Sequence, residues 1–204
     1  LHDWFARRLA QLRPTEWLLC CISGGGADAG RDHLGDMLED ILAHHPGLTF
    51  LRQLPEFQQK YAETVVERIL YTHDPLGRSK LRPEAMRDGR LSRALRSLDV
   101  GDAAVTINSE ANYFSYEHFY VIFSTFCDVD VHQKGVLDAD DLQRYSNCAL
   151  SCRAVERIFT CGRGAVASAG AKLGSMTYAD FVWFLLSEVD KTSRTACGYW
   201  FRIL

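Results

Sequence analysis

A twelve-residue segment from Asp130 to Asp141, DVHQKGVLDADD, constrains the fold of this chain more than any other feature. Carboxylates occupy its first, ninth and twelfth positions, glycine occupies the sixth (Gly135) and leucine the eighth (Leu137). Four large apolar side chains before it have helical spacing and share one face: Phe119, Ile122, Phe123 and Phe126. A second helical pattern, ADDLQRY, ends the unit. This order predicts a helix–loop–helix unit whose loop turns sharply at the glycine.

The segment has the spacing of an EF-hand calcium loop but departs from its ligand set. Such a loop presents oxygens from positions one, three, five, seven, nine and twelve, which here are Asp130, His132, Lys134, Val136, Asp138 and Asp141. His132 offers nitrogen, a poor ligand for a hard ion, and Lys134 brings a positive charge. Asp141 is one methylene shorter than the usual glutamate. We therefore expect a weak or lost Ca²⁺ site whose best ligands are Asp130, Asp138 and Asp141.

A second loop of the same kind lies downstream, in AGAKLGSMTYADF. Gly174 takes the sixth position, Met176 the eighth and Asp180 the twelfth. Positions one, three and five lack side-chain oxygens, since they are Ala169, Ala171 and Leu173. Paired EF-hand loops join through their eighth residues in a short two-stranded bridge that needs no metal. We therefore predict a bridge between Leu137 and Met176, whether or not either loop binds calcium.

Two upstream segments fit the template more loosely. A loop beginning at Asp74 has Leu81 in the eighth position, and one beginning at Ile107 has Phe114 there. We expect an all-α fold of tandem EF-hand-like helix–loop–helix pairs with mostly degenerate loops. The expected divisions are an N-terminal helical segment with a glycine-rich connector (1–50), a first pair (51–125), a second pair sharing a helix with it (114–190), and the start of a further, truncated EF-hand (191–204). Helix–loop–helix rhythm is also typical of other all-α proteins, so the weaker loops depend on the match at Asp130.

Composition and motifs favour a non-enzymatic protein. A net charge of −3 and a sequence pI of about 6.2 predict neither nucleic acid nor a membrane as a partner. The seven cysteines contain no CxxC pair, which is typical of reduced thiols rather than a zinc site. Cys127 lies near His118 and His132, but no oxyanion turn is recognisable, so we expect a buried structural cysteine. The chain contains no P-loop, GxSxG or HExxH motif.

Five stretches extend the comparison beyond a generic EF-hand: HPGLTFL, PEFQQKY, YFSYEHFYVIF, LDADDLQRY and MTYADFVWFLLSEVDK…GYWFR. Over about His45 to Arg202 they resemble the B-double-prime regulatory subunits of protein phosphatase 2A. The family's loop at this place usually has acidic residues at positions three and five, where this chain has His132 and Lys134. The family's stronger calcium loop follows the segment that matches YWFRIL, so the chain is expected to be a fragment.

The resemblance implies a non-catalytic targeting subunit, with or without modulation by calcium. Its implied partners are the scaffold and catalytic subunits of the phosphatase and phosphoprotein substrates. Its implied location is cytoplasmic, with nuclear and centrosome- or microtubule-associated pools as alternatives. A stand-alone EF-hand calcium sensor or buffer is the alternative function. For the docking surface we favour the helix YADFVWFLLSEV, since Trp183 and Phe184 are not expected to share one interior with Phe181 and Leu185.

Overall fold

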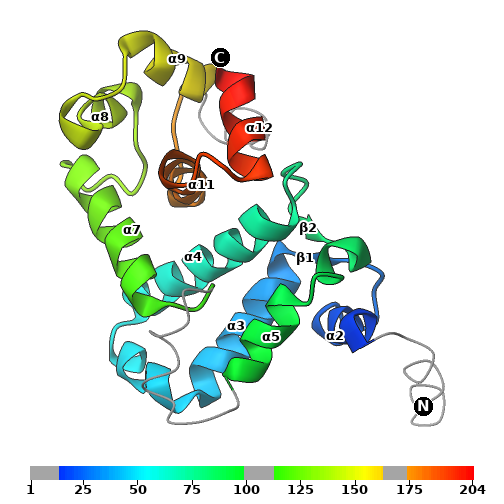
Figure 1. The fold of residues 1–204 in the computed structure, drawn as a ribbon. Helices are drawn as coiled ribbons and strands as arrows, with labels where there is room; N and C mark the ends of the chain where they lie inside the picture. Colours follow the sequence, from blue (N-terminus) through cyan, green and yellow to red (C-terminus); the bar gives the residue numbers. More distant parts are fainter. Residues whose placement is uncertain (1–13, 99–112, 163–173) are drawn as a thin grey trace, which may run out of the picture. The chain divides into compact units, whose positions relative to one another are not determined.

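The computed structural model describes residues 14–98, 113–162 and 174–204, and in these ranges the chain is mainly helical (Figure 1). It divides into two units, Leu1–Tyr116 and Glu117–Leu204. The division differs from the expected boundaries at residues 50 and 125. The helix that begins at Tyr116 starts at the boundary itself, and the expected loop from Ile107 lies largely outside the described residues.

Unit 1 is a pair of helix–loop–helix motifs. In chain order its elements are α2 (Pro14–Ile22), β1 (Ala29–Gly30), α3 (Arg31–His44), the 3-10 helix η1 (Pro46–Gln53), α4 (Pro55–His73), β2 (Lys80–Leu81), η2 (Pro83–Met86) and α5 (Arg90–Ser97). β1 pairs with β2 in antiparallel register, Ala29 opposite Leu81 and Gly30 opposite Lys80. Leu81 is the eighth residue of the loop that begins at Asp74, and the eighth residue is the one expected to form the bridge.

The partner of the Asp74 loop differs from the one expected. It is the glycine-rich segment between α2 and α3, which the sequence indicated to be only a connector. Gly24 and Gly25 have positive φ values of 62° and 100°, a backbone region that glycine enters without steric cost. The glycines thus form a tight loop that brings Ala29 to the bridge. With Ala29 as the eighth residue, positions one, three and five are Ile22, Gly24 and Gly26, so the sequence of this loop shows neither oxygen ligands at these positions nor a large bridging side chain.

The core of unit 1 lies between α3 and α4. Leu34, Leu38 and Leu42 recur every four residues on α3 and are almost wholly buried. On α4 the buried residues include Tyr61, Val65 and Ile69, again at helical spacing. The Tyr61 hydroxyl donates a 2.6 Å hydrogen bond to the carbonyl of Phe114, so the last described residues of unit 1 fold back onto α4.

Unit 2 is the second helix–loop–helix pair, and the described part of the chain continues from it into one further helix, α12. Its elements are α7 (Tyr116–Val129), α8 (Ala139–Gln143), η3 (Tyr145–Asn147), α9 (Cys152–Cys161), α11 (Tyr178–Val189) and α12 (Arg194–Ile203). An aromatic cluster forms its core: the Phe126 and Phe181 rings are 5.4 Å apart and the Tyr145 and Phe184 rings 5.1 Å apart, both edge to face. The expected start of a further EF-hand at 191–204 corresponds to α12 and stays a prediction.

The expectation of an exposed apolar side on α11 is wrong. Trp183 and Phe184 are almost completely buried, as are Phe181 and Leu185. The helix is buried on nearly all sides and leaves only its last apolar residue, Val189, strongly exposed. A helix that is hydrophobic all round is a core helix, and this one is packed accordingly.

Within the described ranges, the longest apolar helices fall short of what a membrane crossing requires.

Candidate functional site

The first half of the Asp130 loop closes on the carboxylate of Asp130. Its Oδ1 accepts a hydrogen bond from the backbone N–H of Lys134 at 3.0 Å, and its Oδ2 accepts one from Gly135 at 2.7 Å. Gly135 has φ +73°, the left-handed conformation that the sharp turn requires. Asp130 is buried. The carboxylate therefore shapes the turn through backbone donors, as it does in an EF-hand loop.

The second half of the loop begins helix α8. Asp138 is the N-cap residue: its Oδ1 accepts the backbone N–H of Asp141 at 3.0 Å. Asp141 reciprocates, since its Oδ2 accepts the backbone N–H of Asp138 at 3.0 Å. This capping box pairs two backbone N–H groups at the start of α8. Asp141, at 1% side-chain exposure, is a buried carboxylate that needs positive partners.

Lys134 supplies the positive charge from inside the loop. Its Nζ donates to Asp138 Oδ2 and, at 2.6 Å, to Asp141 Oδ2. The other oxygen of Asp141, Oδ1, accepts from Nη2 of Arg144 on the next helical turn. The hydrogen bond from Lys134, followed by the backbone N–H of Asp141, lowers the pKa of Asp138 to about 2. Hydrogen bonds to Asp138 and Asp141 in turn raise the pKa of Lys134.

The six loop positions do not form a calcium cage. Asp138 and Asp141 direct oxygens at the Lys134 ammonium, and both oxygens of Asp130 accept backbone N–H groups. His132 and Val136 are exposed. In the parts of the chain that the structure describes, no group of three or more His, Cys, Asp or Glu side chains is placed to hold a metal ion. The residues present therefore do not fit Ca²⁺, which requires six or more oxygens.

The predicted bridge between the two loops of unit 2 is confirmed. The N–H of Leu137 donates to the carbonyl of Met176 at 2.9 Å, and the N–H of Met176 donates to the carbonyl of Leu137 at 2.8 Å. Both side chains belong to the unit 2 core. The second loop then starts α11 with its own capping box between Thr177 and Asp180. Its expected first, third and fifth positions lie outside the described residues.

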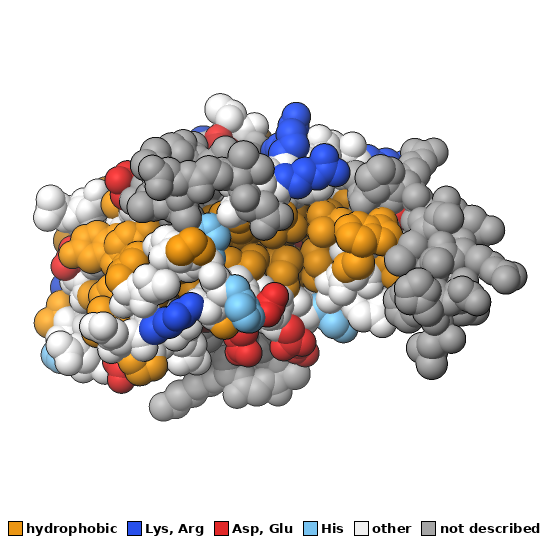
Figure 2. All heavy atoms as spheres, turned by 90° about the horizontal axis from the view of Figure 1, so that it is seen from below, with side chains coloured by type: hydrophobic (Ala, Val, Ile, Leu, Met, Phe, Trp, Pro, Cys, Tyr) orange, Lys and Arg blue, Asp and Glu red, His pale blue; other side chains and the backbone are white. Residues whose placement is uncertain are grey.

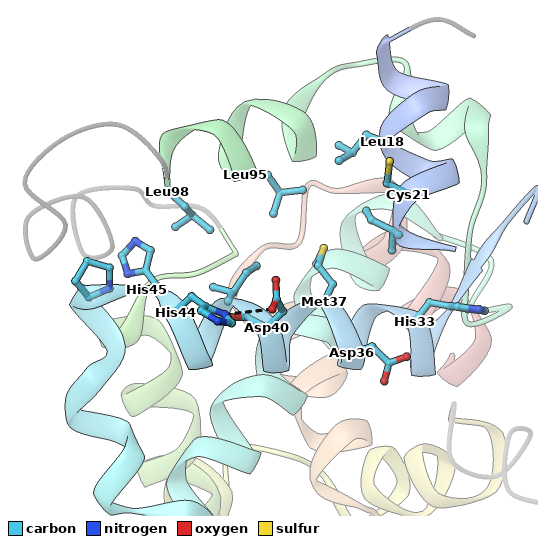
Figure 3. A pocket seen from close by; sticks show the side chains of 13 residues that line it. Leu18, Cys21, His33, Asp36, Met37, Asp40, His44, His45, Leu95 and Leu98 are labelled. Carbon is cyan, nitrogen blue, oxygen red and sulfur yellow. Dashed lines mark hydrogen bonds and ion pairs between the residues drawn. The ribbon is translucent and has the colours of Figure 1, made fainter. Parts of the chain in front are cut away.

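A groove of about 800 Å³ lies in unit 1, among α2, α3 and α5 (Figure 3). Apolar side chains form much of its lining, with Asp36, Asp40 and three histidines on the side of α3 and the turn after it. The lining contains a thiol, Cys21, whose pKa is raised by burial and by Cys20. The groove therefore combines a largely apolar lining with acidic and imidazole side chains, most of them on α3. Figure 2 shows apolar side chains gathered on one face of the molecule beside histidine and acidic groups.

The expectation that Cys127 is buried is wrong: the residue is exposed on α7. Its pKa is raised, first by partial desolvation and then by the negative charges of Asp128 and Asp130.

Comparisons with known proteins agree with this architecture. The model of the EF-hand domain family matches residues 21–101, which include both loops of unit 1. Among curated relatives, the chain is 41% identical to the delta form of the B'' regulatory subunits of mouse (Mus musculus) serine/threonine-protein phosphatase 2A, over 82% of this chain and 33% of that protein. It is 42% identical to the human (Homo sapiens) alpha form, over 82% of this chain and 14% of that protein.

A plant relative gives the same result. The chain is 43% identical to a probable B'' epsilon form from Arabidopsis thaliana, over 81% of this chain and 30% of the relative. The chain thus spans a third or less of the length of these three relatives. Among solved structures, one chain of an assembly described as the PP2A PR70 holoenzyme in a diCa form superposes with a TM-score of 0.83. It is 38% identical, and the match covers 94% of this chain and 68% of that one. The chain belongs to the B'' family of protein phosphatase 2A regulatory subunits.

Proposed function

We propose that this chain is a non-catalytic part of a phosphatase 2A holoenzyme, which binds the scaffold and catalytic subunits and selects phosphoprotein substrates. The observation that carries the proposal is the match to a chain of the PR70 holoenzyme, with a TM-score of 0.83 over 94% of the present chain. The bridged loop pairs support it, because they hold the helices of each pair together without needing a ligand. Such a platform is suited to presenting a surface to other proteins.

Helix α7 offers a defined contact surface for these partners. Phe119 and Ile122 are buried, whereas Tyr120 and Val121 are 52% and 59% exposed. Tyr120 and Val121 are consecutive in the sequence, and at protein interfaces exposed aromatic residues contribute much of the binding energy. We therefore assign Tyr120 and Val121 to the interface with the phosphatase subunits.

Reconstitution tests the proposal directly. The chain is mixed with purified scaffold and catalytic subunits, and the complex is measured by size-exclusion chromatography and biolayer interferometry, with a calcium chelator and with calcium. We expect a ternary complex in both conditions. No association at any calcium concentration would overturn the proposal. In the same assay the chain alone is expected to release no phosphate from a phosphoprotein, and the reconstituted complex to change the rate for selected phosphoproteins.

The double variant Tyr120→Ser/Val121→Ser tests the assigned surface. It is expected to weaken binding about tenfold, since losing one interface anchor typically costs more than about 1 kcal/mol. Leu76→Ser is the matched control, because Leu76 is similarly exposed (61%) but lies in the Asp74 loop of unit 1. An unchanged affinity in the double variant, with an unchanged melting temperature, would move the interface elsewhere.

A stand-alone calcium sensor or buffer is the alternative, and it requires a loop with free oxygens. The Lys134 contacts within the Asp130 loop disfavour it. Calorimetric titration with Ca²⁺ separates the two functions.

For location we propose the cytoplasm, with nuclear and centrosome- or microtubule-associated pools as alternatives. The free state of all seven cysteines supports a reducing compartment.

A further inference from the structure

We infer that Lys134 is the built-in cation of the Asp130 loop: its ammonium group takes over the structural role of a calcium ion and keeps the loop closed without metal. The inference is independent of the proposed function, since it concerns how unit 2 is held together. It reverses the expectation drawn from the sequence, in which Lys134 only repelled a metal.

The contacts of Lys134 are those that a loop cation has to make. A calcium ion in an EF-hand draws the middle of the loop to its ninth and twelfth positions, which begin the exiting helix. Lys134 stands at position five and donates to Asp138 at position nine and Asp141 at position twelve. The ammonium thus connects the middle of the loop to the first turn of α8.

The local charge is also nearly balanced. Three carboxylates of the loop face inward or cap its turns, namely Asp130, Asp138 and Asp141. Lys134 and Arg144 offset two of these negative charges, and two backbone N–H groups bind the third. A calcium ion would have to displace the ammonium and would then lie beside the Arg144 guanidinium. The exposed Asp128 and Asp140 on the rim add further negative charge.

The buried carboxylate makes the lysine necessary. Asp141 is 1% exposed and pairs with both Lys134 and Arg144. Removing Lys134 would leave Arg144 as the one cationic partner of Asp141 among these contacts and would take the ammonium from Asp138, and loss of a partner from a buried ion pair is costly. In a functional calcium loop, by contrast, replacing the residue at position five mainly costs metal affinity. The two arrangements therefore predict different behaviour for the same substitution.

Three forms of the 204-residue chain distinguish them: the unmodified chain, Lys134→Gln and Lys134→Asp. Each is melted in chelator and in roughly millimolar Ca²⁺, the free concentration at which weak EF-hands fill. We expect the unmodified chain to melt at the same temperature in both. Lys134→Gln should melt about 5 °C lower in both, because a neutral amide cannot balance Asp141. Lys134→Asp should melt lower in chelator and regain part of the loss with Ca²⁺.

A readout at the loop itself removes any contribution from other sites. The amide N–H of Gly135 donates to Asp130, and its NMR signal reports the state of the turn. In the unmodified chain we expect this signal to be unchanged by Ca²⁺, and in Lys134→Asp to shift with added ion. A calcium-dependent shift of Gly135 in the unmodified chain, or a Lys134→Gln variant as stable as the parent, would overturn the inference. Should Lys134→Asp not fold, the unmodified chain and Lys134→Gln still decide the question.

Discussion

The two units each join a pair of loops by an antiparallel bridge, but they place their charges differently around it. In unit 1 the ion pair runs across the bridge, from Lys80 Nζ to Asp28 Oδ2 at 3.2 Å, and both side chains are well exposed, at 53% and 40%. In unit 2 the lysine lies within one loop and its partner Asp141 is buried. The bridge is thus the shared element, and the charges around it vary independently.

The difference teaches which part of the EF-hand architecture depends on charge. An exposed pair such as Lys80–Asp28 is weak, because water and salt screen it. The ionic contacts of Asp141 matter more for stability, because a buried carboxylate that lost its partners would oppose folding. Unit 1 therefore relies on its bridge and apolar core, whereas unit 2 adds an ionic contact that its loop requires.

The largest expected effect tests the shared element. Leu81→Ala in unit 1 and Leu137→Ala in unit 2 each remove a fully buried bridge side chain, and each is expected to cost about 3 kcal/mol of unfolding free energy. Urea denaturation with hydrogen exchange resolved by unit provides the measurement. If only one of the two variants is destabilised, the bridges are not equivalent and the comparison fails.

An intermediate effect should separate the two ion pairs. Asp141→Asn removes the buried charge while keeping the shape of the side chain, and should cost about 2 kcal/mol, within the range for hydrogen bonds to charged groups. Asp28→Asn is the matched change in unit 1 and should cost less than about 0.5 kcal/mol. Equal effects in chemical denaturation would show that burial does not distinguish the two carboxylates.

The smallest expected effect concerns salt. Lys80→Ala should lower the unfolding free energy by no more than about 0.5 kcal/mol at low ionic strength. This difference should disappear near about 1 M NaCl, where the Debye length is about 3 Å. Arg93→Ala, which changes a surface charge on α5 outside the bridge, is the control. A salt-resistant loss at Lys80 would indicate a role in the strand pair beyond its charge.

Much of the structure of unit 2 could be predicted from the sequence, because the patterns that specify it lie within short segments. The spacing from Asp130 to Asp141 predicts the loop, and the apolar eighth residues predict the bridge between Leu137 and Met176. The structural role of Lys134 could not be predicted from such patterns. Spacing shows that a positive charge enters the loop, whereas only geometry shows that it is bound by Asp138 and Asp141.

Unit 1 was harder to predict because its first loop carries neither oxygen ligands nor a large bridging side chain. Ala29 and Gly30 resemble linker residues, and only their pairing with Leu81 and Lys80 identifies them as a bridge. The error at Trp183 has a related cause. An apolar residue on the far side of a helix indicates a surface only when nothing covers that side, and periodicity does not show what covers it.

Asp141 connects two events in the folding of unit 2. Helix α8 has five residues, too few to persist alone, since the first turn of a helix is entropically unfavourable. The carboxylate that accepts the N–H of Asp138 also binds Lys134 and Arg144, so the helix start and the closed loop share one side chain. We therefore expect loop closure and helix nucleation to form a single cooperative step, in which α8 loses its protection from hydrogen exchange at the same time as the turn at Gly135.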